Sequence, residues 1–138
     1  MLDVSSAALA RACTRLGTRG AHVRWIEADV TGAWQVPPVD IWHDRAVFHF
    51  LVTSQQRDAY IAHLRGTVKP GGTAIIATFG LDGPPKCSGL PVERYDPPAV
   101  AALLGPDFEI AETMDDAHQT PVGGVQVFAF GRFIKKYG

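Results

Sequence analysis

The chain has 138 residues, of which 46% are hydrophobic and 20% charged, a composition typical of one globular domain with its own core. Its net charge is -1 and its charged residues are interspersed, which argues against nucleic acid and against membrane surfaces as partners. The N-terminus lacks a signal-peptide pattern, and no apolar run reaches the roughly 18 residues that span a bilayer. Cys13 and Cys87 are far apart in the sequence. We therefore expect a single cytoplasmic domain over residues 1–138, with reduced thiols and no metal site.

Residues 5–43 predict a helix followed by two strands. Apolar residues recur at helical spacing over 5–16, and the segment 22–28 contains the β-branched and aromatic residues that favour strands. A loop at 32–38 leads to a short apolar segment at 39–43, which has the composition of a buried parallel strand.

The middle of the chain predicts a second helix and a third strand. Thr53 and Gln56 have the spacing of a capping box and begin the helix. Lys69-Pro70-Gly71-Gly72 ends it and turns the chain, because proline removes a backbone donor and glycine favours turns. The segment 73–79 is almost continuously apolar, which is typical of a parallel strand buried on both faces.

The last third predicts a long loop, a helix and a β-hairpin. Residues 80–95 contain too many glycines and prolines for a regular element, and a loop of this length is typical of a functional one. Asp96 caps a helix whose first residue is Pro97. The segments 108–113 and 125–134 are too close in sequence for a helical crossover, so we expect them to pair antiparallel.

This order of elements predicts an α/β fold: an open, mostly parallel Rossmann-like sheet with helices on its faces and a C-terminal antiparallel β-hairpin. Ligands of such sheets bind beyond the carboxyl ends of the parallel strands. The rule directs attention to Asp3, Asp29 and the segment 43–45. Trp25, Trp42, Phe128 and Phe130 are assigned to the core.

Acidic residues at three strand ends, the Lys69-Pro70-Gly71-Gly72 turn before an apolar strand and a closing hairpin together resemble class I S-adenosylmethionine-dependent methyltransferases. The resemblance runs over nearly the whole chain. It implies S-adenosylmethionine as cofactor, with Asp3 on the ribose hydroxyls, Asp29 and the backbone of Val30 on the adenine, and His43 beside the methionine part. Each residue also has a plain structural explanation, since Asp3 can cap a helix and Asp29 can end a strand in a turn.

The resemblance also suggests residues for catalysis and substrate binding. Asp44 and His49 are the candidates for orienting or deprotonating the methyl acceptor, because both can accept protons near neutral pH when suitably placed. The alternative is an Asp44–Arg45 ion pair and a core histidine. Cys87, His118 and Gln126 are candidates for substrate contact, because the first lies in the long loop and the other two flank the hairpin tip.

A complete domain of this family begins with a strand that runs into a G-x-G-x-G loop, and nothing before Asp3 can supply it. The resemblance therefore implies a domain truncated at its N-terminus, with a gap in the middle of the sheet. Unpaired backbone groups at such a gap must be satisfied. Three arrangements are open: the strand at 22–28 pairs with the strand at 39–43, two chains pair their edges, or the rest of the protein is a separate polypeptide or was lost from the gene.

Two functions from different classes follow. The first is S-adenosylmethionine-dependent methyl transfer to a small-molecule acceptor, or descent from an enzyme that did this. The second is a non-catalytic interaction module whose open edges hold a homodimer or another protein. A different doubly wound nucleotide-binding domain is disfavoured, because no phosphate-cradling loop follows a strand.

Overall fold

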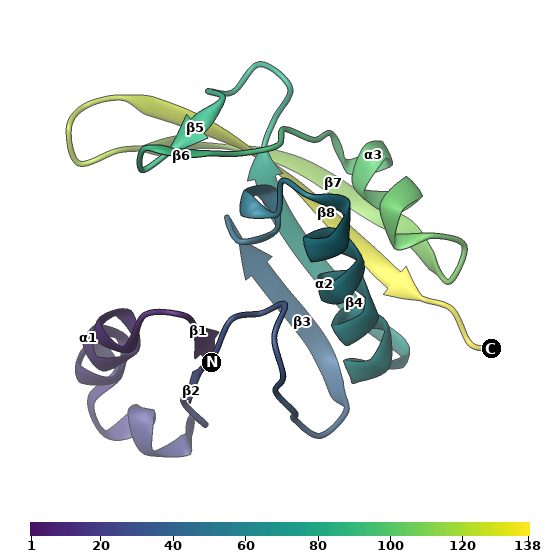
Figure 1. Ribbon diagram of the computed structural model, residues 1–138, viewed down its shortest axis with the longest axis horizontal. Coiled ribbons are helices and arrows are strands. Elements are labelled where there is room, and N and C mark those ends of the chain that lie inside the picture. Colours follow the sequence, from purple (N-terminus) through teal and green to yellow (C-terminus); the bar gives the residue numbers. More distant parts are fainter. The chain divides into compact units, whose positions relative to one another are not determined.

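The computed structural model describes residues 1–138, which form two compact units, Met1–Val36 and Pro37–Gly138 (Figure 1). In the first unit, strands β1 and β2 are parallel neighbours in a two-stranded sheet. The elements of this unit are β1 (Leu2–Asp3), α1 (Ser6–Leu16), the 3-10 helix η1 (Gly17–His22) and β2 (Ile26–Glu27).

Helix α1 forms where its apolar spacing predicts it. The Ser5 side chain caps it by accepting a hydrogen bond of 3.2 Å from the Ala8 backbone N–H. The strand predicted over 22–28 is shorter than expected, because only Ile26–Glu27 is paired. Its partner β1 is two residues long, and a strand can be no longer than the ladder that holds it.

The second unit is built on a four-stranded sheet with the order β3-β4-β8-β7. Strands β3 and β4 are parallel, while the β4–β8 and β7–β8 pairs are antiparallel. The elements of this unit are β3 (Val39–Arg45), the 3-10 helix η2 (Phe48–Phe50), α2 (Ser54–Thr67), β4 (Val68–Phe79), β5 (Lys86–Cys87), β6 (Leu90–Pro91), α3 (Pro97–Leu104), β7 (Phe108–Gln119) and β8 (Val125–Lys135).

The predicted α/β class and the closing antiparallel hairpin are confirmed, but the prediction of one mostly parallel sheet is wrong. The parallel strands divide into two sheets, because β2 pairs with β1 and β3 pairs only with β4. The hairpin then adds two antiparallel pairings to the single parallel one in the larger sheet. The arrangement in which the strand at 22–28 pairs with the strand at 39–43 is not formed.

The helices of the second unit cover one face of its sheet (Figure 1). Helix α2 begins with the predicted capping box of Thr53 and Gln56 and packs against β4, while α3 packs against β7 and β8. The two helices are joined where the Arg65 side chain of α2 donates to the Leu104 carbonyl of α3. No helix of the structure is long and apolar enough to cross a membrane.

The Lys69-Pro70-Gly71-Gly72 segment lies at the start of β4 rather than in a turn before it. Val39 pairs with Val68 and Ile41 with Thr73, so the segment bulges out of register with β3. Gly71 takes a φ of +75°, a conformation that side-chain-bearing residues rarely adopt. The predicted turn is therefore not formed: α2 has already ended at Thr67, and residues 69–72 distort strand β4 instead.

Candidate functional site

The carboxylate of Asp44 organises the turn that follows strand β3. One oxygen accepts from the Val47 backbone N–H at 2.9 Å, and the other accepts from the Phe48 N–H at 3.0 Å and from the Tyr60 hydroxyl at 2.6 Å. Tyr60 in turn accepts a hydrogen bond of 2.8 Å from the indole of Trp42. The alternative, an Asp44–Arg45 ion pair, is absent, because Asp44 points toward α2 and Arg45 toward the other face of the sheet.

Asp44 is a buried carboxylate within a strained turn. Ala46 has a φ of 67°, which places a residue with a side chain in the left-handed region. Burial raises the pKa of Asp44, while the hydrogen bond from Tyr60 opposes that shift. The pKa of Tyr60 lies well above its usual value because the ring is buried beside that carboxylate. Asp44 therefore supports the backbone at the carboxyl end of β3 with all of its acceptor oxygens engaged.

His49 lies in the core beside this turn and is fully buried. Its Nδ1 accepts a hydrogen bond of 3.2 Å from the Phe79 backbone N–H, so the proton of the neutral ring is on Nε2. Burial lowers the pKa of His49 to about 4. Nε2 is the one buried side-chain polar atom without a hydrogen-bond partner. The geometry gives His49 a free donor and no free lone pair at neutral pH.

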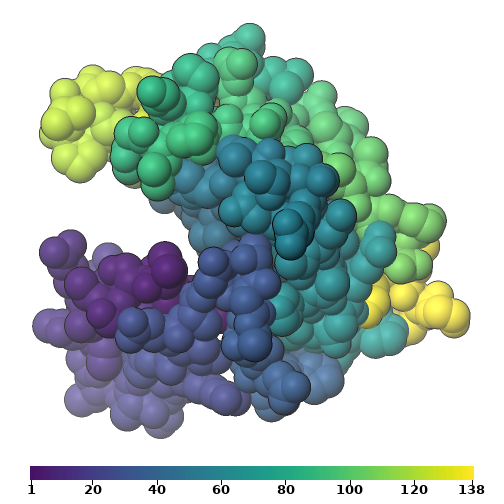
Figure 2. All heavy atoms as spheres, in the orientation of Figure 1, coloured from purple at the N-terminus to yellow at the C-terminus, as the bar shows by residue number.

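The long loop after β4 folds over this histidine. Its backbone is tied to the site because Glu93 N–H donates to the His49 carbonyl at 2.8 Å. Val92 is buried with Ala77, Phe79 and Phe128, and Cys87 packs against the same four residues, which we call the Phe128 cluster. Within the loop, β5 and β6 form a tight hairpin, and the space-filling view shows this green segment against the yellow-green β7–β8 hairpin (Figure 2).

The three residues predicted to contact substrate all lie around the β7–β8 hairpin. His118 and Gln126 are partners across the hairpin, and the His118 ring lies 6.3 Å from that of Phe128. Gln126 lines a cavity of about 670 Å³ that also involves Leu81, Asp96 and Met114. Cys87 and His118 are not among the residues that line it. The structure thus brings Cys87 and His118 to the Phe128 cluster and Gln126 to the adjoining cavity.

In the first unit, Asp3 and Asp29 follow the same edge of the β1–β2 sheet. Asp3 ends β1 in register with Glu27, and Asp29 comes two residues after Glu27 at the end of β2. One oxygen of Asp3 accepts from the Ser5 N–H at 2.8 Å, and one oxygen of Asp29 accepts from the Thr31 N–H and hydroxyl. Those bonds from Thr31 lower the pKa of Asp29. Each carboxylate keeps a second oxygen free to accept a hydrogen bond.

The other two residues predicted to bind the cofactor are on the surface or half-buried. Val30, half-buried after Asp29, uses its carbonyl to accept from the Trp34 indole at 2.9 Å. His43 is exposed on β3, on the sheet face opposite α2. No group of three or more His, Cys, Asp or Glu side chains is arranged to hold a metal ion.

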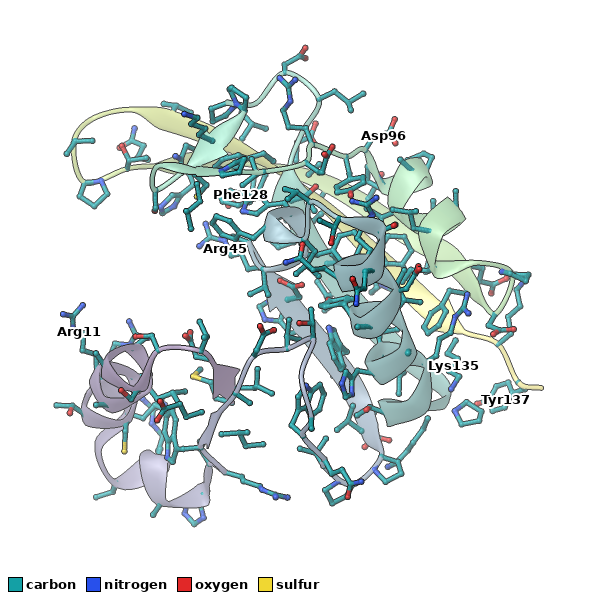
Figure 3. All side chains as sticks on the ribbon, in the orientation of Figure 1. Arg11, Arg45, Asp96, Phe128, Lys135 and Tyr137 are labelled. Atoms are coloured by element: carbon teal, nitrogen blue, oxygen red, sulfur yellow. The ribbon has the colours of Figure 1, made fainter.

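Arg45 and Phe128 form a contact that the sequence did not predict as part of a site. Their side chains meet over strand β4, with the guanidinium carbon 4.7 Å from the ring centroid (Figure 3). A cation above an aromatic face is attracted by the ring quadrupole. The assignment of Phe128 to the core is confirmed, since 4% of it is exposed. No pattern in the sequence links residues 83 positions apart, so only the sheet register reveals the pair.

The fold is similar to those of solved methyltransferases. NodS, an N-methyltransferase from Bradyrhizobium japonicum WM9, matches with a TM-score of 0.73 and 18% identity over 99% of this chain and 72% of that chain. The 1,6-didemethyltoxoflavin-N1-methyltransferase of Burkholderia thailandensis matches with a TM-score of 0.72 and 20% identity over 99% of this chain and 60% of that chain. Both have been solved with S-adenosylhomocysteine.

An S-adenosylmethionine-dependent methyltransferase from Methanosarcina mazei matches with a TM-score of 0.73 and 14% identity over 99% of this chain and 81% of that chain. No protein-family model and no curated protein matches the sequence. The resemblance inferred from the order of motifs is thus confirmed for the fold, which is that of S-adenosylmethionine-dependent methyltransferases. The chain spans only part of the length of each of these proteins.

Proposed function

We propose that this chain carries out S-adenosylmethionine-dependent methyl transfer to a small acceptor. The observation that carries the proposal is the pair of carboxylates, Asp3 and Asp29, at the ends of two adjacent parallel strands within a methyltransferase fold. Ribose hydroxyls and the adenine amino group are hydrogen-bond donors, and each carboxylate has an oxygen left to accept from them. The hydrogen-bond donors of a nucleoside therefore match the acceptor oxygens of Asp3 and Asp29.

In this proposal Asp3 holds the ribose, and Asp29 and the Val30 backbone hold the adenine. When bound, S-adenosylmethionine supplies an electrophilic methyl group on its sulfonium, and the electrons of the broken C–S bond stay on sulfur. Methyl transfer depends mainly on positioning of the two reactants. This chain contributes two acidic residues for that purpose and no dedicated base is required.

Asp44 and His49 take positioning roles in the proposal. Asp44 holds the strained turn and thereby sets the direction of Arg45 and the entry to η2. His49 is fully buried and its Nδ1 lone pair accepts from the Phe79 N–H, so its part in the proposal is to hold the end of β4 rather than to remove a proton. Cys87 and His118 are proposed to contact the acceptor at the Phe128 cluster, and Gln126 from the adjoining cavity.

Calorimetric titration with S-adenosylhomocysteine tests the cofactor site. We expect binding in the micromolar range, and Asp29→Ala to weaken it about tenfold or more, because a charge-assisted hydrogen bond contributes roughly 1.5–3 kcal/mol. Asp29→Asn keeps an oxygen that can accept from Thr31, so it should lose less affinity for S-adenosylhomocysteine than Asp29→Ala does. Asp58→Ala, at an exposed position on α2, is the control and should bind as the wild type does. Equal affinity in Asp29→Ala and wild type would remove Asp29 from the site.

A second candidate function, a homodimeric interaction module, is favoured by the edge of β3. This seven-residue strand has β4 as its one partner, so the backbone groups of its other edge are unpaired within the sheet. Ile41 on this strand is 62% exposed. An isologous pairing of two such edges satisfies those groups.

Sedimentation velocity tests this second candidate. We expect a dimer that Ile41→Lys converts to a monomer, because a lysine on an edge strand opposes strand pairing. Val125→Lys is the matched control, since Val125 is also 62% exposed but lies on β8. A wild-type chain that stays monomeric at high concentration contradicts the module, as does a dimer that both variants retain.

A further inference from the structure

Arg45 differs from the other arginines of residues 37–138 in that its side chain makes no hydrogen bond to the protein and contacts only the Phe128 ring. The others each donate to a backbone carbonyl or a carboxylate: Arg57, Arg65, Arg94 and Arg132. Neither ion pair of the chain includes Arg45, and its guanidinium presents five N–H donors. A permanent positive charge is thus held on the surface without a protein counterion.

The contact with Phe128 gives this charge a defined position. Arg45 lies at the end of β3, and its guanidinium reaches across β4 to the Phe128 ring on β8 (Figure 3). The ring itself is buried and packed against Phe79 at 5.1 Å. A guanidinium that rests on a fixed aromatic ring loses less conformational freedom on binding than a free side chain does.

Two further side chains lie near the Phe128 ring, on β7 and in the loop after β4. His118 lies 6.3 Å from the Phe128 ring, and Cys87 packs against the Phe128 cluster. Asp116, the register partner of Phe128 on β7, forms no ion pair with Arg45. Arg45 and His118 therefore approach one ring from β3 and β7, the two outer strands of the sheet.

We propose that Arg45 binds an oxyanion of the substrate, so that the methyl acceptor is a small organic anion bearing a carboxylate or a phosphate. A guanidinium matches either group, because its parallel N–H bonds pair with two oxygens. The identity of the bound anion as the methyl acceptor rests on the proposed methyl transfer. The anion site itself stands on the Arg45–Phe128 geometry.

Titrations of the full chain with benzoate, phenyl phosphate and benzamide, followed through the Arg45 side-chain Nε–Hε resonance by NMR, test the site. Benzamide has the shape of benzoate without its charge, so we expect at least one anion to bind and benzamide to bind at least tenfold more weakly. Preference for benzoate assigns a carboxylate, and preference for phenyl phosphate assigns a phosphate. Equal effects of all three compounds overturn the proposal.

Variants locate the anion on Arg45. Arg45→Gln should weaken anion binding about tenfold, as measured through the backbone amides of β3 and β8. Arg45→Lys should retain part of the anion affinity, because lysine keeps the positive charge without the planar guanidinium. Arg11→Gln, at an exposed arginine of α1, should leave anion binding unchanged. Anion binding that survives in Arg45→Gln overturns the assignment.

A parallel titration with S-adenosylhomocysteine separates this inference from the proposed function. Arg45→Gln should keep at least part of the binding of that compound, because its nucleoside is proposed to be held by Asp3 and Asp29. Wild-type binding of S-adenosylhomocysteine without anion binding overturns the anion site alone. Anion binding without S-adenosylhomocysteine binding leaves the site supported and counts against the methyltransferase proposal.

Discussion

Asp44→Ala is expected to lower the free energy of unfolding by about 3 kcal/mol, a large part of the roughly 5–15 kcal/mol that stabilises a typical domain. The substitution removes the acceptor of three hydrogen bonds and leaves the Tyr60 hydroxyl and the Val47 and Phe48 N–H groups unpaired. Burial of the carboxylate offsets part of what those bonds contribute, which its raised pKa reflects. The lost acceptors decide the sign, because unpaired buried donors cost about 1–3 kcal/mol each.

Urea-induced unfolding of the variant measures this loss. Asp40→Ala is the matched control on the same strand, since Asp40 pairs with Lys69 at 2.8 Å but its side chain is 81% exposed. We expect that control to change the free energy of unfolding by less than about 0.5 kcal/mol. If Asp44→Ala and Asp40→Ala lower the free energy of unfolding by the same small amount, Asp44 does not support the turn.

The second large effect is a dependence of stability on pH that arises from His49. Its pKa is about 4 in the folded protein and 6.5 when unperturbed, so the unfolded chain binds more protons between these values. The free energy of unfolding therefore falls as the pH is lowered from about 6.5 to 4, by at most about 3 kcal/mol from this group. Asp44 acts in the opposite direction, because its folded pKa is raised.

Comparison with His49→Gln isolates the histidine from the other titrating groups. We expect the wild type to lose about 2 kcal/mol more stability than the variant between pH 7 and pH 4.5, as measured by urea unfolding at both pH values. His49→Phe should remove the same pH dependence, although it also leaves the Phe79 N–H without its acceptor. Stability curves of wild type and variants that run parallel over this range would show that His49 titrates normally.

Local patterns predicted the helices and the hairpin because the relevant interactions are between neighbours in sequence. The capping box of Thr53 and Gln56, the Asp96 cap with Pro97 after it, and the turn between β7 and β8 each depend on a few adjacent residues. Strand lengths were predicted less well. The strand expected over 22–28 shrank to two residues, because a strand needs a partner that its own sequence does not contain.

The candidate site residues divide in the same way. The sequence by itself determined the fold class, the carboxylates Asp3 and Asp29 at strand ends, and the candidates in the long loop and hairpin. Only the tertiary structure decided that the strands form two sheets, that Asp44 is saturated with hydrogen bonds, and that Arg45 rests on Phe128. These are contacts between residues far apart in the chain, and strand register and burial set them rather than any local pattern.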